Sequence, residues 1–222
     1  MRRRRWPVGR FSPGPFTLRG LGATALYWAA RHGHAPAVAA LVADAPDTLN
    51  AVTTENETAL MAAAACGSAE AVAALLHAGA AVDVRAAEFD HTALHMAVTN
   101  NCVAAVGALL NARVPVNAVS TCGYTPLHLA AEQLSLPITV ILLKDGANVG
   151  AASHDGVTAL HLAASWGGAD IVKHLLQAKA DPSVVNSARK TPTDETADNG
   201  HTEVAALLVA AEGGYQGAPA AA

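Results

Sequence analysis

The chain has 222 residues, a formal net charge of −4, and 52% hydrophobic but only 4% aromatic residues. No run of 18 apolar residues occurs, which argues against a membrane-spanning helix. The three cysteines have no disulfide or metal-site spacing, which favours a reducing, intracellular compartment, either cytoplasmic or nuclear. An interior with so few rings has to be built from Ala, Leu and Val.

The first 22 residues differ in charge from the rest. They hold six arginines and no acidic residue, whereas residues 23–222 hold 8 basic and 18 acidic residues. Like-charge blocks are usually solvated, so we expect residues 1–22 to be a basic, disordered leader. Two alternatives stay open, namely an organelle-targeting signal and an arm that binds nucleic acid or an anionic membrane.

A threonine recurs every 33 or 34 residues along the remaining chain, and the six are Thr24, Thr58, Thr92, Thr125, Thr158 and Thr191. Each begins a version of one motif, T-[A/P]-L-H-x-A in its fullest form at residues 125–130. Such periods are typical of solenoids built from one repeated unit. These residues resemble the ankyrin repeat, and the resemblance covers roughly residues 20–210.

The residues within each copy predict two helices. The threonine suits a helix N-cap, and an apolar residue two positions later with an alanine three beyond it forms a narrow apolar stripe. A second apolar set, such as Val72, Leu75 and Leu76, has the i, i+3, i+4 spacing of another helix. Glycine or asparagine nine positions after the threonine suits the left-handed end of the first helix. Only the fourth copy has Leu134 there, so we expect a locally remodelled turn.

We therefore predict an all-α solenoid of six ankyrin-like helix-turn-helix repeats, joined by short hairpin-like finger turns, over residues 23–210. Residues 211–222 are expected to form a flexible tail. The last copy is polar where the others are apolar, with Thr193, Asp194 and Glu195, as a terminal repeat with no further neighbour requires. We expect a monomer.

The positions of the histidines predict a structural role rather than metal binding or catalysis. His95, His128 and His161 share one place in three copies and resemble the structural histidine of the family. His91 and His95 lie four apart, but Thr92 begins the helix between them, which removes the geometry of a zinc pair. No phosphate-binding loop or nucleophile motif is present, so we expect no catalysis, cofactor or metal.

The resemblance places a binding surface on the fingers and the first helices. The residues that it implies are Arg31, His32, Glu55, Glu57, Glu88, Phe89, His91, Asn100, Tyr124, Glu132, Gln133, His154, Asp155, Trp166 and Lys190. Three of the chain's few aromatics, Phe89, Tyr124 and Trp166, belong to this set. Exposed aromatics are typical of binding hot spots, although each ring could instead pack onto a neighbouring repeat.

We therefore expect a non-catalytic protein-interaction module or adaptor, whose partner is a protein of basic character because the repeats are acidic. The alternative is a nucleic-acid or anionic-membrane tether that depends on the arginines of the leader.

Overall fold

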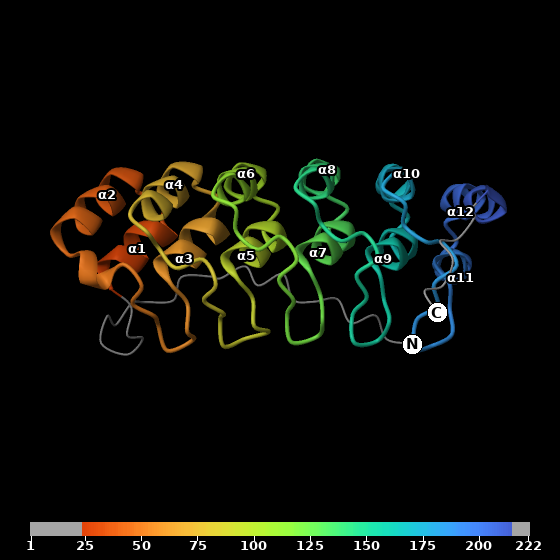
Figure 1. The fold of residues 1–222 in the computed structure, drawn as a ribbon, viewed down its shortest axis with the longest axis horizontal. Coiled ribbons are helices and arrows are strands. Elements are labelled where there is room, and N and C mark those ends of the chain that lie inside the picture. Colours follow the sequence, from red (N-terminus) through yellow and green to blue (C-terminus); the bar gives the residue numbers. More distant parts are fainter. Residues whose placement is uncertain (1–23, 215–222) are drawn as a thin grey trace, which may run out of the picture.

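The computed structural model describes residues 24–214, which form six helix pairs stacked side by side in a single elongated array (Figure 1). The first helices make one layer: α1 (Ala25–Arg31), α3 (Ala59–Cys66), α5 (Ala93–Thr99), α7 (Pro126–Glu132), α9 (Ala159–Ser165) and α11 (Pro192–Asn199). The second helices make the other: α2 (Ala35–Asp44), α4 (Ala69–His77), α6 (Val103–Asn111), α8 (Leu136–Lys144), α10 (Ala169–Gln177) and α12 (Thr202–Gly214). A short 3-10 helix, Pro46–Thr48, follows α2.

Each first helix begins at the threonine that the repeat pattern marks. In the third repeat, His95 Nδ1 accepts a hydrogen bond from the Thr92 backbone N–H at 3.2 Å, and its Nε2 lies 3.2 Å from the carbonyl oxygen of Tyr124 in the next repeat. His128 and His161 repeat this arrangement with the next repeats. One buried ring therefore caps its own helix and ties two repeats together.

The core is a continuous layer of small and medium aliphatic side chains between neighbouring repeats. Leu60, Leu94, Leu127 and Leu160 are all buried, and the alanine three positions after each of them is completely buried. Each first helix packs on the first helices of the adjacent repeats, and alanine permits this close approach. The predicted all-α solenoid is confirmed.

The turn between the two helices of the fourth repeat differs from our expectation. Leu134 adopts a left-handed backbone with φ +53°, so the turn keeps the shape that glycine gives elsewhere. The next repeat accommodates the larger residue: a Cβ added at Gly168 would lie 2.6 Å from Leu134 Cδ2. At the following junction the sizes are reversed, since a Cβ at Gly167 would lie 2.6 Å from His201 Nδ1. The predicted remodelling is wrong because a glycine 34 residues away leaves room for the leucine.

The loops between repeats project from the array as fingers (Figure 1). Within a finger the backbone closes as in a hairpin, for example from the Ser120 N–H to the Tyr124 carbonyl oxygen at 2.9 Å. Adjacent fingers are also joined, for example from the Thr121 N–H to the Phe89 carbonyl oxygen at 2.9 Å. Main-chain bonds therefore hold the fingers in a row.

The C-terminal helix α12 continues to Gly214, past the domain boundary expected at residue 210. Alanine and leucine dominate its sequence and favour helix, so nothing ends it at that point. The expected leader, residues 1–22, and residues 215–222 of the expected tail lie outside the described residues. Among the helices of residues 24–214, none is both long and apolar enough to cross a membrane.

Candidate partner-binding surface

We use the term finger face for the surface made by the finger residues 53–57, 86–91, 120–124, 153–157 and 186–190 together with the exposed ends of the first helices. Nine of the residues expected to bind a partner lie on these fingers: Glu55, Glu57, Glu88, Phe89, His91, Tyr124, His154, Asp155 and Lys190. The other six lie at first-helix ends: Arg31 and Glu132 are last residues, His32, Asn100, Gln133 and Trp166 are C-caps.

The first two repeats bring Arg31 and Glu57 together through a residue that the sequence did not single out. The Tyr27 hydroxyl donates to Glu57 Oε2 at 2.5 Å and accepts from Arg31 Nη1 at 3.1 Å. Burial, and then the bonded Glu57 carboxylate, raise the pKa of Tyr27 to about 12. Tyr27 occupies the place where later copies have the structural histidine, and this departure was the available signal.

Two of the three predicted aromatics are exposed on the finger face. Phe89 is 37% exposed and has φ +62°, and Trp166 is 40% exposed. A bulky side chain in the left-handed region is strained, and such strain is common at functional sites. The Phe89 ring lies 5.7 Å from the ring of His91, which stacks at 5.1 Å on His95. Burial lowers the pKa of His91.

The third aromatic, Tyr124, is half-buried rather than fully solvent-facing. Its ring stacks on His128 with centroids 5.2 Å apart and packs against the core. Burial and then the charge of Glu132 raise its pKa to about 12. Glu132 is itself half-buried, burial raises its pKa, and it makes no hydrogen bond or ion pair with any residue in 24–214.

Several predicted residues have structural contacts. The Asn100 side chain donates to the Met96 carbonyl oxygen at 2.9 Å and so stabilises the end of its own helix. The backbone of His154 donates to Cys122 of the preceding finger at 3.1 Å. His32 is exposed and its ring stacks on Trp28 at 6.2 Å.

Three further residues bond neighbouring fingers or repeats through their carbonyl oxygens. Glu55 accepts from the Ala87 N–H at 2.8 Å, and Asp155 accepts from the Ser187 N–H at 2.8 Å. The Lys190 carbonyl oxygen lies 3.1 Å from His161 Nε2. The side chains of Glu55, Glu88, Gln133 and Asp155 are exposed.

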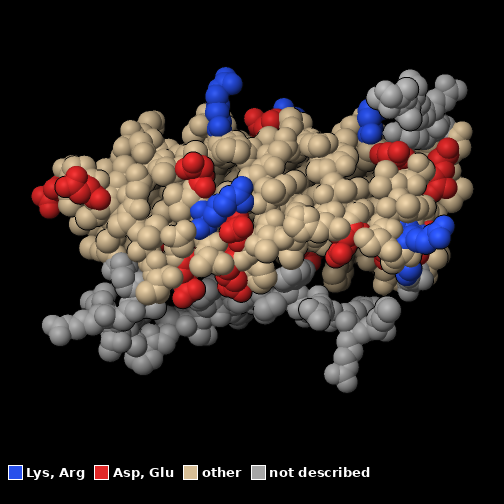
Figure 2. Space-filling model, turned by 60° about the horizontal axis from the view of Figure 1, so that its bottom comes forward, with Lys and Arg blue, Asp and Glu red and all other residues tan. Residues whose placement is uncertain are grey.

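Acidic and basic side chains are interspersed on the side of the array shown in Figure 2. Carboxylates outnumber basic groups on the finger face, which holds Glu55, Glu57, Glu88, Asp90, Glu132 and Asp155 against Arg31, Arg189 and Lys190. Lys173 pairs with Asp170 at 3.2 Å on helix α10, away from the fingers. The finger carboxylates have no lysine or arginine of the described chain within ion-pair distance. A surface on which carboxylates outnumber basic groups favours a partner of the opposite sign.

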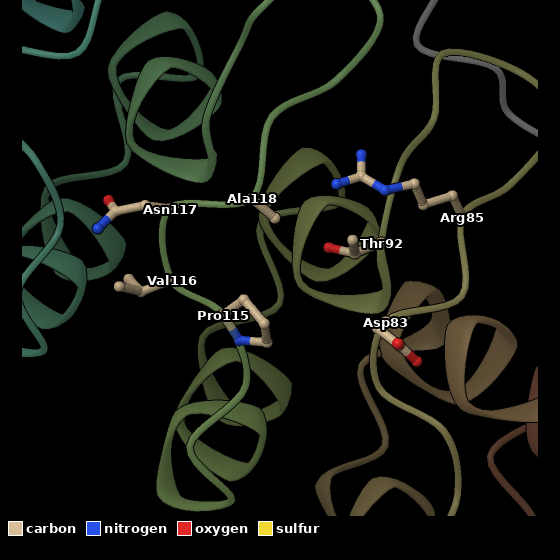
Figure 3. A pocket seen from close by; sticks show the side chains of 7 residues that line it. All are labelled: Asp83, Arg85, Thr92, Pro115, Val116, Asn117 and Ala118. Carbon is tan, nitrogen blue, oxygen red and sulfur yellow. The ribbon is translucent and has the colours of Figure 1, made fainter.

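A hollow of about 570 Å³ lies beside the fingers of the third and fourth repeats, and its lining residues are Asp83, Arg85, Thr92, Pro115, Val116, Asn117 and Ala118 (Figure 3). The Arg85 guanidinium reaches across it and donates to the Val119 carbonyl oxygen at 2.6 Å. Asp83 instead points away from Pro115 (Figure 3).

A missing hydrogen bond explains this hollow. At the next such junction, Asn117 Oδ1 accepts from the Asn148 backbone N–H at 2.8 Å. The corresponding pair is Asp83 and Pro115, and proline has no N–H to donate. Because Arg85 is already bonded and Asp83 turns away, we attribute the hollow to an imperfect junction and not to a ligand site.

The described part of the chain offers no metal centre, since no group of three or more histidine, cysteine, aspartate or glutamate side chains in it could hold an ion. The predicted scaffold role of His95, His128 and His161 accounts for both nitrogens of each ring.

Together, the stacked helix pairs and the row of fingers define a helical repeat protein. Three matches to a family model described as ankyrin repeats (3 copies) cover residues 12–86, 80–153 and 137–217. The chain therefore belongs to the ankyrin repeat family. A comparison with curated proteins found no match. Ankyrin repeats generally serve as protein-protein interaction modules and typically have no catalytic role.

Proposed function

We propose that the chain is a non-catalytic adaptor that binds a protein partner across the finger face. The observation that carries this proposal is the exposure of two large aromatic side chains, Phe89 and Trp166, on that face. Exposed rings lose the free energy that burial would provide, and at interfaces such residues account for much of the binding energy.

The charge of the finger face indicates a basic partner. Glu55, Glu88 and Asp155 are exposed, and Glu132 is half-buried, without a countercharge in the described chain. Complementary potentials raise association rates and discriminate against wrong partners. A protein segment with lysine or arginine around an apolar centre fits this surface.

Site-specific photo-crosslinking tests the proposal. A benzophenone amino acid replaces Trp166 or Phe89 in the full chain, and Val103 on the second helix α6 is the matched control because it is 38% exposed. In lysate of the native cells, the two finger-face positions should crosslink one shared protein, and the Val103 position should not.

Equal crosslinking from Val103 would contradict the assignment of the face. Partner binding that does not depend on the finger-face positions and weakens steeply with added salt would instead indicate counterion release, as for nucleic acid bound by the leader arginines.

A further inference from the structure

We propose that an arginine side chain of the partner binds between Tyr124 and Glu132, and so joins an arginine, a tyrosine and a carboxylate as Arg31, Tyr27 and Glu57 are joined in the first two repeats. This inference rests on the proposed function, because it names the chemistry that the partner brings to the finger face. It assigns the partner's arginine to one place in the fourth repeat.

Three features of Glu132 make its charge unfavourable in the chain alone. It is the last residue of helix α7, where a negative charge opposes the helix dipole. It is half-buried, and it has no hydrogen-bond or ion-pair partner among residues 24–214. Burial of an unpaired carboxylate costs free energy, in agreement with its raised pKa. Local costs of this kind are expected where a ligand later supplies the missing partner.

The first repeat shows how the same position is satisfied internally. Arg31 and Glu132 both lie seven residues after their repeat's threonine. In the first repeat the next finger supplies Glu57, and Tyr27 bonds to both charged groups. In the fourth repeat the next finger supplies Val157 in the place of Glu57. An apolar neighbour cannot pair with the carboxylate, so the missing group has to come from outside the array.

Tyr124 provides the second contact for an incoming side chain. Glu132 lies one helical turn after His128 on α7, the ring on which Tyr124 stacks, and the charge of Glu132 raises the pKa of Tyr124. Its ring stacks on His128, and no hydrogen bond of its hydroxyl occurs within the described residues. In the preceding repeat, the buried Thr99 Oγ1, at the position equivalent to Glu132, has no hydrogen-bond partner either. This stretch of the finger face therefore carries polar groups with no internal partner.

Arginine fits better than lysine. A guanidinium has five N–H donors in one plane, so it can bond a carboxylate and a hydroxyl together and also lie against an aromatic ring. Arg31 makes two of these contacts in the first repeat, with Nη1 on the Tyr27 hydroxyl and its guanidinium carbon 5.8 Å from the Trp28 ring centroid.

A short peptide provides the test on the full chain. The probe is Gly-Gly-Arg-Gly-Gly with both ends blocked, so that the guanidinium is its only charge, and citrulline in place of arginine gives the neutral control. Backbone NMR titration of the labelled chain should show saturable shifts at Tyr124, Glu132 and Gln133 with the arginine peptide and none with the control.

Variants separate this site from general attraction to an acidic surface. Glu132→Gln should weaken peptide binding about fivefold or more, and Tyr124→Phe about threefold, which are modest changes in free energy for charge-assisted hydrogen bonds. Glu88→Gln is the matched control, since it removes the same charge from an exposed finger position. Spectra unchanged away from the site would show that each variant is folded.

Two results would overturn the inference: equal peptide affinity in Glu132→Gln and the unaltered chain, or equal losses from Glu132→Gln and Glu88→Gln. If Trp166 still crosslinks a partner in either case, the proposed function stands and only the arginine assignment fails. If the peptide binds at Glu132 while Val103 crosslinks the partner as strongly as Trp166, the proposed function fails.

Discussion

Acid should destabilise the array through its buried histidines, and His95 allows the size of the effect to be worked out. The ring is completely buried, with Nδ1 accepting from the Thr92 N–H and Nε2 beside the Tyr124 carbonyl oxygen. Burial first, and then the charge of His91, lower its pKa from 6.5 to about 4. The unfolded chain therefore binds this proton more tightly than the folded chain.

The sign and the pH range follow from linkage. The stability that the neutral ring provides is present above pH 6.5 and is lost as the pH falls toward the folded-state pKa of about 4. At about 1.4 kcal/mol for each pKa unit, the loss from His95 alone is about 2 kcal/mol at pH 5. His128 and His161, whose pKa values burial also lowers, add losses in the same direction.

Urea unfolding followed by far-UV circular dichroism measures this loss at about pH 7.5 and about pH 5. His95→Gln removes the titrating group but can keep the capping box, since glutamine also suits that position. The unaltered chain should lose about 2 kcal/mol more than His95→Gln over this range. His77→Gln, at an exposed position of α4, is the control and should behave as the unaltered chain. Equal losses in His95→Gln and the unaltered chain would refute this reasoning.

Three further predictions concern the core, the turns and the surface. Leu127→Ala, at a residue 1% exposed in the middle of the array, should reduce the free energy of unfolding by about 2 to 5 kcal/mol, and a loss below about 1 kcal/mol in urea would place this residue outside the core. Gly67→Ala should lower the melting temperature more than Gly79→Ala: both glycines are left-handed, but only at Gly67 would the new Cβ lie 2.9 Å from a side chain, Cys102 Sγ. Similar melting of the two variants would show that this contact relaxes freely. Trp166→Ala should weaken binding of the crosslinked partner by about 2 kcal/mol without changing the circular dichroism spectrum, and unchanged affinity would move the binding site to another face.

The repeat architecture could be predicted from the sequence because each recurring residue, such as the N-cap threonine, determines the structure of the helix to which it belongs. Thr58 and Thr92 accept hydrogen bonds from the first turns of their helices, as their position before an apolar stripe predicts. Leu60 and Leu94 are buried for the same local reason, since the period fixes which face of each helix meets its neighbour.

Features that depend on another repeat could not be predicted. Leu134 keeps a glycine-like turn because Gly168, in the next repeat, leaves room for it. The bond between Tyr27 and Glu57 also joins two repeats. Single-copy patterns do not record which side chains face each other across a junction.

Hydrogen exchange of the complex tests the binding of a partner to the finger face most directly. The partner identified by crosslinking is added to the full chain, and amide protection is compared with that of the chain alone. New protection should appear in fingers 86–91, 120–124 and 153–157 and at the end of helix α7, with none in the second helices α6 and α8. Protection confined to α6 and α8, with the fingers unchanged, would contradict the account.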